Sequence, residues 1–159
     1  MPGFEKAYLT QTGTKACVRE TRRILGEYVL TGEDVLKTHK FIDVVAHGAY
    51  PIDIHNPQGK GTVLKRVRTG EAYDIPLRCL IPLSVENLLV AGRCISGTSE
   101  ALASYRVMPI SMATGQAAGV CAAIASKNNL TPRNVNAKDV QLELLRQGAL
   151  LEIKNNSIS

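Results

Sequence analysis

The chain has 159 residues, the size of one compact domain, and a chain of this length can bury a core without disulfides or metal. Its formal net charge of +5 is dispersed and not interleaved with aromatic residues, which argues against nucleic acid and favours a solvated charged face. The sequence begins without a signal-peptide run and shows no stretch of about 18 apolar residues, so we expect a cytoplasmic protein with no membrane partner.

The cysteines and histidines do not suggest a metal centre. The four cysteines are far apart and include no C-x-x-C pair. Three of them, Cys79, Cys94 and Cys121, lie in apolar runs, where a reduced cysteine behaves as a small hydrophobic residue. Because the three histidines are irregularly spaced as well, we expect no metal site.

The first half of the chain predicts short strands and one short helix. Residues 16–30 contain many β-type residues around a glycine and are expected to be extended. Thr31 can cap a helix, and acids at positions 33 and 34 favour its positive end. Extended runs are then predicted at 40–46, 52–55 and 73–81, with a polar loop at 56–71 in which Val63 and Leu64 form a short edge strand.

The second half has a different character. Residues 87–91 predict a short buried strand that ends at Gly92, and residues 100–105 a helical turn. Pro109 suits the first position of a helix that runs to about Lys127 and is full of glycine and alanine, so it can lie close to a sheet or a cofactor. A final helix is expected to be capped near Asn136 and to stop at Gly148.

A strand, a glycine turn and then a helix form the most informative pattern, because a helix start presents free N–H groups and a partial positive charge. Gly92 and Gly97 have the spacing of a phosphate loop, but Thr98 stands where that motif requires lysine, which excludes a nucleotide triphosphatase. The pair Gly59 and Gly61 is the nearest G-x-G, and its polar surroundings favour a turn over a dinucleotide fingerprint.

Several separated segments resemble one family. Residues 85–96 (VENLLVAGRCIS), 100–109 (EALASYRVMP) and 115–119 (GQAAG) look like the C-terminal flavin-binding motif of the FAD-dependent oxidoreductases. Residues 18–31 and 50–55 resemble strands of that family's substrate domain. The resemblance spans roughly residues 16–148, in the family's order.

The resemblance implies a glutathione-reductase-like flavoprotein of α/β class. Residues 1–84 would be a partial, β-rich substrate domain contributing a mixed sheet, and residues 85–159 the closing strand and helices of a Rossmann-like FAD domain. By the same resemblance, the turn would lie near the pyrophosphate and ribityl chain, and the helix start near the flavin ring, where its amides would stabilise the anionic reduced flavin. The residues so implied are Gly92 and Arg93 for the turn, and Met108, Pro109, Ile110 and Ser111 for the ring.

The sequence departs from the family in one respect: it contains no G-x-G-x-x-G unit for the adenine half of FAD. We therefore expect a truncated portion of the parent enzyme, natural or cloned, with weakened affinity for FAD. A sheet cut in this way would expose an edge through which the chain could form a homo-oligomer.

Three residues are candidate catalytic groups. Asp53 and His55 are two positions apart in a predicted strand, so their side chains lie on the same face. They could be catalytic partners beside the flavin, or they could form a structural hydrogen bond. Arg106, just before the flavin-facing helix, could favour an anionic flavin or a substrate carboxylate, with Glu100 as its partner. Arg19, Arg22 and Arg23 could clamp a phosphate or an anionic substrate, or form a salt-bridged face.

The function implied is hydride transfer between FAD and an unidentified small organic substrate. Two alternatives stay open. The chain could be a catalytically inert fragment or an assembly subunit that needs a separate nucleotide-binding partner, or it could be an unrelated domain whose glycine turn binds a phosphate.

Overall fold

The computed structural model describes residues 2–3, 5–15, 18–20, 22–55 and 61–151. Cys17 and Gly59 lie outside them. The elements are α1 (Gly32–Leu36), β1 (Val44–Gly48), β2 (Ile52–His55), β3 (Thr62–Lys65), β4 (Tyr73–Pro76), the short 3-10 helices η1 (Leu77–Cys79), η2 (Gly92–Cys94) and η3 (Pro132–Asn134), and the helices α2 (Ser99–Tyr105), α3 (Met108–Lys127) and α4 (Ala137–Arg146).

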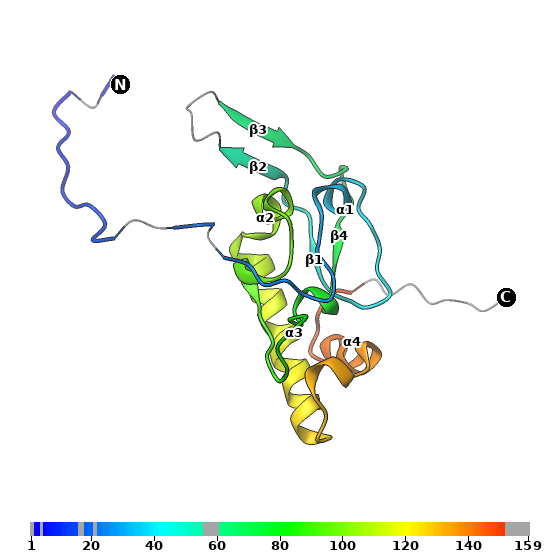
Figure 1. Cartoon of the computed structure of the whole chain (residues 1–159). Helices are drawn as coiled ribbons and strands as arrows, with labels where there is room; N and C mark the ends of the chain where they lie inside the picture. The colour runs from blue at the N-terminus through cyan, green and yellow to red at the C-terminus, as the bar shows by residue number, and fades with distance from the viewer. Residues whose placement is uncertain (1, 4, 16–17, 21, 56–60, 152–159) are drawn as a thin grey trace.

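Two antiparallel sheets of two strands each stand beside the helices, which confirms the predicted α/β class (Figure 1). β1 pairs with β4, so that His47 lies opposite Asp74, and β2 pairs with β3, so that Asp53 lies opposite Leu64. α3 runs along β1, and α4 packs on both. Division into domains at residue 84 stays a prediction.

Local signals in the sequence explain where the helices begin. Thr31 accepts a hydrogen bond from the Asp34 amide and the Asp34 carboxylate accepts one from the Thr31 amide, which is a capping box. Pro109 lies in the first turn of α3, and Asn136 caps α4, as the sequence predicts. After α4 the chain turns at Gly148, whose φ is +85°.

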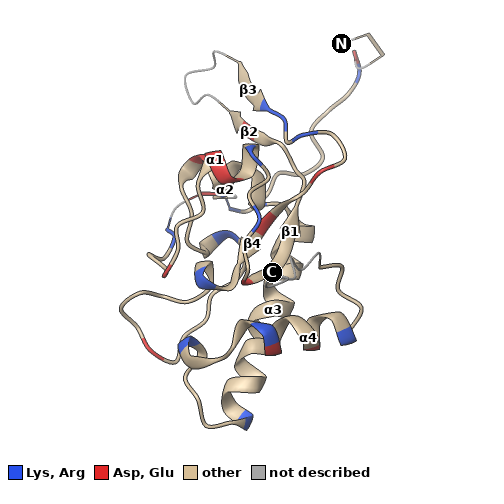
Figure 2. Ribbon diagram, turned by 90° about the vertical axis from the view of Figure 1, so that its right-hand side faces the viewer, with Lys and Arg blue, Asp and Glu red and all other residues tan. Residues whose placement is uncertain are grey.

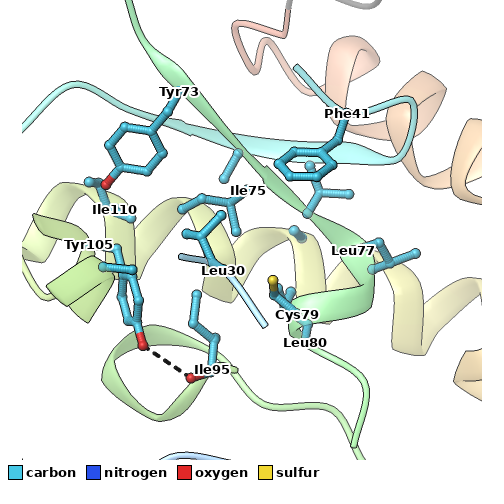
Figure 3. Close-up of a cluster of buried hydrophobic side chains, with 14 of the residues drawn as sticks. Leu30, Phe41, Tyr73, Ile75, Leu77, Cys79, Leu80, Ile95, Tyr105 and Ile110 are labelled. Atoms are coloured by element: carbon cyan, nitrogen blue, oxygen red, sulfur yellow. Dashed lines mark hydrogen bonds between the residues drawn. The ribbon is translucent and has the colours of Figure 1, made fainter. Parts of the chain in front are cut away.

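The core lies between the β1–β4 sheet and the helices α2 and α3 (Figure 3). Its largest fully buried side chains include Tyr73 and Tyr105. The Tyr73 hydroxyl lies 2.7 Å from the Ser104 hydroxyl, and the Tyr105 hydroxyl donates to the carbonyl of Ile95 over 3.2 Å. Both phenols are therefore satisfied inside the core, and the contact between Tyr73 and Ser104 joins β4 to α2.

One predicted strand is wrong and another is shorter than predicted. Residues 87–91 form no ladder among the described residues: Asn87 has a left-handed φ of +55°, and the Val90 amide donates to the Leu80 carbonyl just after η1. Because Leu80 directly follows a 3-10 helix, the chain beside it is not extended and offers residues 87–91 no strand to pair with. Likewise, the run at 73–81 stays a strand only to Pro76 and then coils into η1.

The boundaries of the other strands are close to the prediction. β1 begins at Val44 instead of residue 40, and β2 covers the predicted residues 52–55. β3 contains Val63 and Leu64, both half exposed, as expected of an edge strand. In the described part of residues 16–30, the chain makes isolated bridges at Gly26 and Leu30. Assembly through an open sheet edge stays a prediction.

α3 contradicts one premise of the sequence analysis, because it has the length and apolar composition of a membrane span. Lys127 is its one charged residue, and Figure 2 shows an almost uncharged helix. Its buried face, including Ala117 and Cys121, packs in the core, where the same composition is required. The expected lack of a membrane partner stays a prediction.

Candidate functional site

The first turn of α3 is open to solvent. Its N-cap is Val107, which makes no capping hydrogen bond through its side chain within the described residues. Met108 is 79% exposed, Pro109 is exposed, and Ile110 turns into the core at 5%. Side chains therefore do not cap this helix start, and its partial positive charge faces outwards.

The glycine turn lies directly against this helix start. The Gly92 amide donates to the Thr114 hydroxyl over 3.0 Å, and a Cβ on Gly92 would stand 3.5 Å from the Ser111 side chain. Gly92 has a φ of +71°, a left-handed conformation that suits glycine. The turn and the first turns of α3 are thus held together.

A pocket of about 530 Å³ forms at this junction. It is lined by Arg19, Arg93, Arg106, Met108, Ser111 and Met112. A second, smaller pocket of about 350 Å³ shares two of these arginines and is lined by Val18, Arg19, Arg22, Ala91, Arg93 and Cys94. Three arginines therefore line the pocket at this helix start and a fourth, Arg22, lines the pocket beside it, an arrangement suited to an anion with an apolar portion.

The structure brings Arg106 and Asp53 together, but the guanidinium contacts the backbone of Asp53 and not its carboxylate. Arg106 Nη2 donates to the backbone carbonyl of Asp53 over 2.8 Å. His55 Nε2 lies 3.4 Å from Asp53 Oδ2, and His55 Nδ1 lies 3.3 Å from the Thr62 hydroxyl. The Asp53–His55 contact and the contact with Thr62 both lie within the paired strands β2 and β3, and the first pocket has neither Asp53 nor His55 in its described lining.

The predicted partner of Arg106 is wrong. Glu100 Oε1 instead accepts a hydrogen bond from Lys65 Nζ over 2.6 Å. That ion pair connects α2 to β3, whereas Arg106 connects the end of α2 to β2. Consequently, the guanidinium of Arg106 is anchored to the backbone at one nitrogen while its side chain lines the pocket.

Two of the upstream arginines lie at the site and the third does not. Arg19 and Arg22 line the smaller pocket, whereas Arg23 donates to the Gly97 carbonyl over 2.8 Å and pairs with Glu20. Arg93 donates to the Val18 carbonyl over 3.1 Å, which holds the upstream segment beside the turn.

Two residues of the site were missed by sequence reasoning. Met112 follows Met108 by four positions and so shares its helix face, a spacing that could have identified it. Thr114 accepts the hydrogen bond from Gly92 and itself donates to the Ile110 carbonyl. Nothing in the sequence around a threonine in the middle of a helix indicates that it accepts a hydrogen bond from a distant turn. Among the described residues, no group of three His, Cys, Asp or Glu could hold a metal ion.

Comparison with known proteins identifies the family of the chain. The model of the family described as FAD dependent oxidoreductase matches residues 1–144. No curated protein and no solved structure matches the chain. The family match covers most of the sequence and includes both the glycine turn and the start of α3. The chain therefore belongs to the FAD dependent oxidoreductase family, whose cofactor is FAD.

Proposed function

We propose that the start of α3 and the Gly92 turn hold the flavin end of FAD, and that the parent reaction is hydride transfer with a small organic substrate. The observation that carries this proposal is the pocket in which Arg93, Arg106, Met108 and Ser111 meet. The family resemblance assigns Arg93, Met108 and Ser111 to the cofactor, and Arg106 is a candidate catalytic group from its place just before α3. The four residues come from η2, from the end of α2 and from α3, and line one pocket.

The residues present fit a flavin. The helix start offers backbone N–H groups free of a side-chain cap, and the neighbouring arginines offer charge to phosphate or to an anionic ring. Met108 and Met112 supply the apolar contact that an aromatic ring needs. Gly92 keeps the backbone of the turn free of a side chain beside Ser111.

Each residue has a proposed role. Arg93 and Arg19 bind phosphate oxygens from the mouth of the smaller pocket, and the amides at the start of α3 face the ring carbonyls. Arg106 orients an anionic substrate or stabilises negative charge beside the ring. When bound, FAD supplies the two-electron chemistry.

Asp53 and His55 have a more limited proposed role. Asp53 positions Arg106 through its backbone carbonyl, and its carboxylate lies beside His55. The half-exposed imidazole can accept or deliver a proton at Nε2, with Thr62 beside its other nitrogen. For this role a substrate must extend from the pocket towards β2.

Spectroscopy of the purified chain tests the proposal. We expect it to show flavin absorbance bands as isolated or after incubation with FAD and removal of free cofactor by gel filtration. Arg93→Gln should lower the retained flavin, and Arg66→Gln, an exposed arginine outside both pockets, should not. A folded protein that stays colourless with excess FAD would contradict the proposal.

The exposed face of α3 favours a second candidate function, that of a subunit docking a nucleotide-binding partner. Gly115 and Gly119 lie on this face, and a Cβ at either position would meet no heavy atom within 4 Å. Such a face lets another backbone approach closely. If this function holds, FAD binds only after a protein carrying the adenine-binding unit is added.

A further inference from the structure

One buried hydroxyl joins the Gly92 turn to α3. Thr114 lies in the second turn of that helix and is 0% exposed. Its hydroxyl accepts a hydrogen bond from the Gly92 amide over 3.0 Å. Within the described residues this is the one hydrogen bond between η2 and α3. The attachment of the turn to the helix by hydrogen bonding therefore depends on a single side chain.

The same hydroxyl is also held from the helix side. Its proton is directed to the carbonyls of Ile110, over 3.0 Å, and Ser111, over 3.1 Å. A threonine hydroxyl has one proton to donate and lone pairs with which to accept, so both of its functions are used here. The hydroxyl is thus fixed in its rotation, and it holds the turn at a defined distance from the first turn of α3. Packing alone would not require a hydroxyl at this position.

The turn in its place holds the arginines of the site. Arg93, directly after Gly92, lines both adjoining pockets. Its Nη1 donates to the Val18 carbonyl over 3.1 Å, and the Ile24 amide donates to the Cys94 carbonyl over 3.0 Å. The upstream arginines that line the smaller pocket lie between these two contacts. A shift of the turn would therefore move Arg93 and the upstream segment together.

The two flanks of the turn are attached to another part of the chain. The Val90 amide donates to the Leu80 carbonyl and the Ser96 amide donates to the Cys79 carbonyl, each over 2.9 Å. Both acceptors lie at the end of η1, and neither contact involves α3. Loss of the Thr114 hydroxyl would therefore release the middle of the segment while its ends stay in place. The expected result is a local displacement of the turn in a chain that remains folded.

We propose that Thr114 is a positioning residue of the flavin site, which sets the distance between Arg93 and the start of α3. This inference rests on the proposed function, in which Arg93 binds phosphate oxygens. The apolar contacts proposed for the ring come from Met108 and Met112, which belong to α3 itself. Thr114 therefore acts on recognition of the phosphate and not on recognition of the ring.

Flavin fluorescence, titrated with the full chain, tests the proposal with FMN and riboflavin, which differ by one phosphate group. Thr114→Val exchanges the hydroxyl for a methyl group. We expect it to weaken FMN binding about ten-fold, because the turn loses its hydrogen bond to the helix, and to change riboflavin binding by less than about two-fold. Thr114→Ser keeps the hydroxyl and should bind FMN within about two-fold of the wild type.

Thr131→Val is the matched control. The Thr131 hydroxyl oxygen is also buried, but it has no hydrogen-bond partner in the described part of the chain. The same chemical change there should leave the affinity for both flavins unchanged. A second control combines Thr114→Val with Arg93→Gln. If Thr114 acts by positioning Arg93, Thr114→Val should have little further effect on FMN binding once that guanidinium has been removed.

The outcomes separate this inference from the proposed function. A wild-type chain that binds neither flavin overturns both. The inference alone is overturned if the wild type binds FMN no tighter than riboflavin, if Thr114→Val leaves FMN binding unchanged or weakens both flavins equally, or if Thr114→Ser does not restore FMN binding. Thermal unfolding shows whether each variant is folded, and if Thr114→Val is not, the same titration of Thr114→Ala decides.

Discussion

Arg106 and Asp53 are 53 residues apart in sequence, and a hydrogen bond of 2.8 Å joins the guanidinium of one to the backbone carbonyl of the other. It fixes the end of α2, and so the start of α3, against β2. The geometry of the proposed flavin pocket therefore depends on a contact to β2.

Substitution of Arg106 by glutamine should reduce both stability and flavin retention. Removing the hydrogen bond to Asp53 should lower the free energy of unfolding by about 1 kcal/mol, since the side chain is only partly buried. Urea unfolding measures this loss. Arg66→Gln, at an exposed position with no side-chain hydrogen bond or ion pair within the described residues, should stay within about 0.5 kcal/mol of the wild type.

Two glycine-to-alanine substitutions near the start of α3 should have opposite effects. Gly92→Ala should destabilise the protein by about 1–2 kcal/mol, because alanine must adopt the left-handed φ of +71° although Ser111 leaves room for its Cβ. Gly115→Ala, exposed and helical, should stabilise it by about 0.5–1 kcal/mol. Equal effects in chemical denaturation would show that the turn does not require glycine.

Unfolding measured as a function of pH should reveal how much the ionised Asp74 carboxylate contributes to stability. Its folded pKa is held below the unfolded value, so its contribution is present above the unfolded pKa and is lost as the pH falls through the folded pKa. Asp74→Asn should therefore destabilise the protein by about 2 kcal/mol or more at pH 7, because Lys40 loses its buried partner. The difference from the wild type should shrink below about pH 4. A difference that is the same at both ends of this pH range would contradict the assignment.

Thiol reactivity should separate the described cysteines. Burial raises the pKa of Cys79 to about 12 and that of Cys121 to about 11, whereas Cys94 is exposed. In a Cys17→Ser background, a thiol reagent at about pH 8 should modify Cys94 rapidly, and should modify Cys79 and Cys121 only after unfolding. Cys94→Ser should abolish the rapid phase, and its persistence would contradict the burial of the other two thiols.

Local signals allowed part of this fold to be predicted from sequence. The capping box at Thr31, the start of α3 at Pro109 and the alternating strand 52–55 each depend on neighbouring residues. A strand at 87–91 would need a neighbouring strand to pair with. The chain that it contacts, at Leu80, forms a 3-10 turn instead. A sequence pattern reports burial and extension but not the availability of a ladder.

The candidate site shows the same division. Met108, Ser111 and Arg93 were assigned through the family resemblance and Arg106 from its place before α3, and all four line the pocket. Gly92, Pro109 and Ile110, which the resemblance also assigned, are not in its described lining. The partners of the lining residues could not be assigned in this way, because Arg106 bonds to a carbonyl 53 residues away and Glu100 pairs with Lys65. Backbone acceptors are present at every residue, so no residue type marks the one that is used.

The central claim is that the start of α3 holds the flavin end of FAD, and a competition experiment tests it most directly. Flavin fluorescence is titrated with the chain, using FAD and FMN as ligands and ADP as competitor. The account predicts that FMN binds about as well as FAD, that ADP does not compete, and that Arg93→Gln weakens both flavins about ten-fold. Displacement of FAD by ADP, with no binding of FMN, would contradict it.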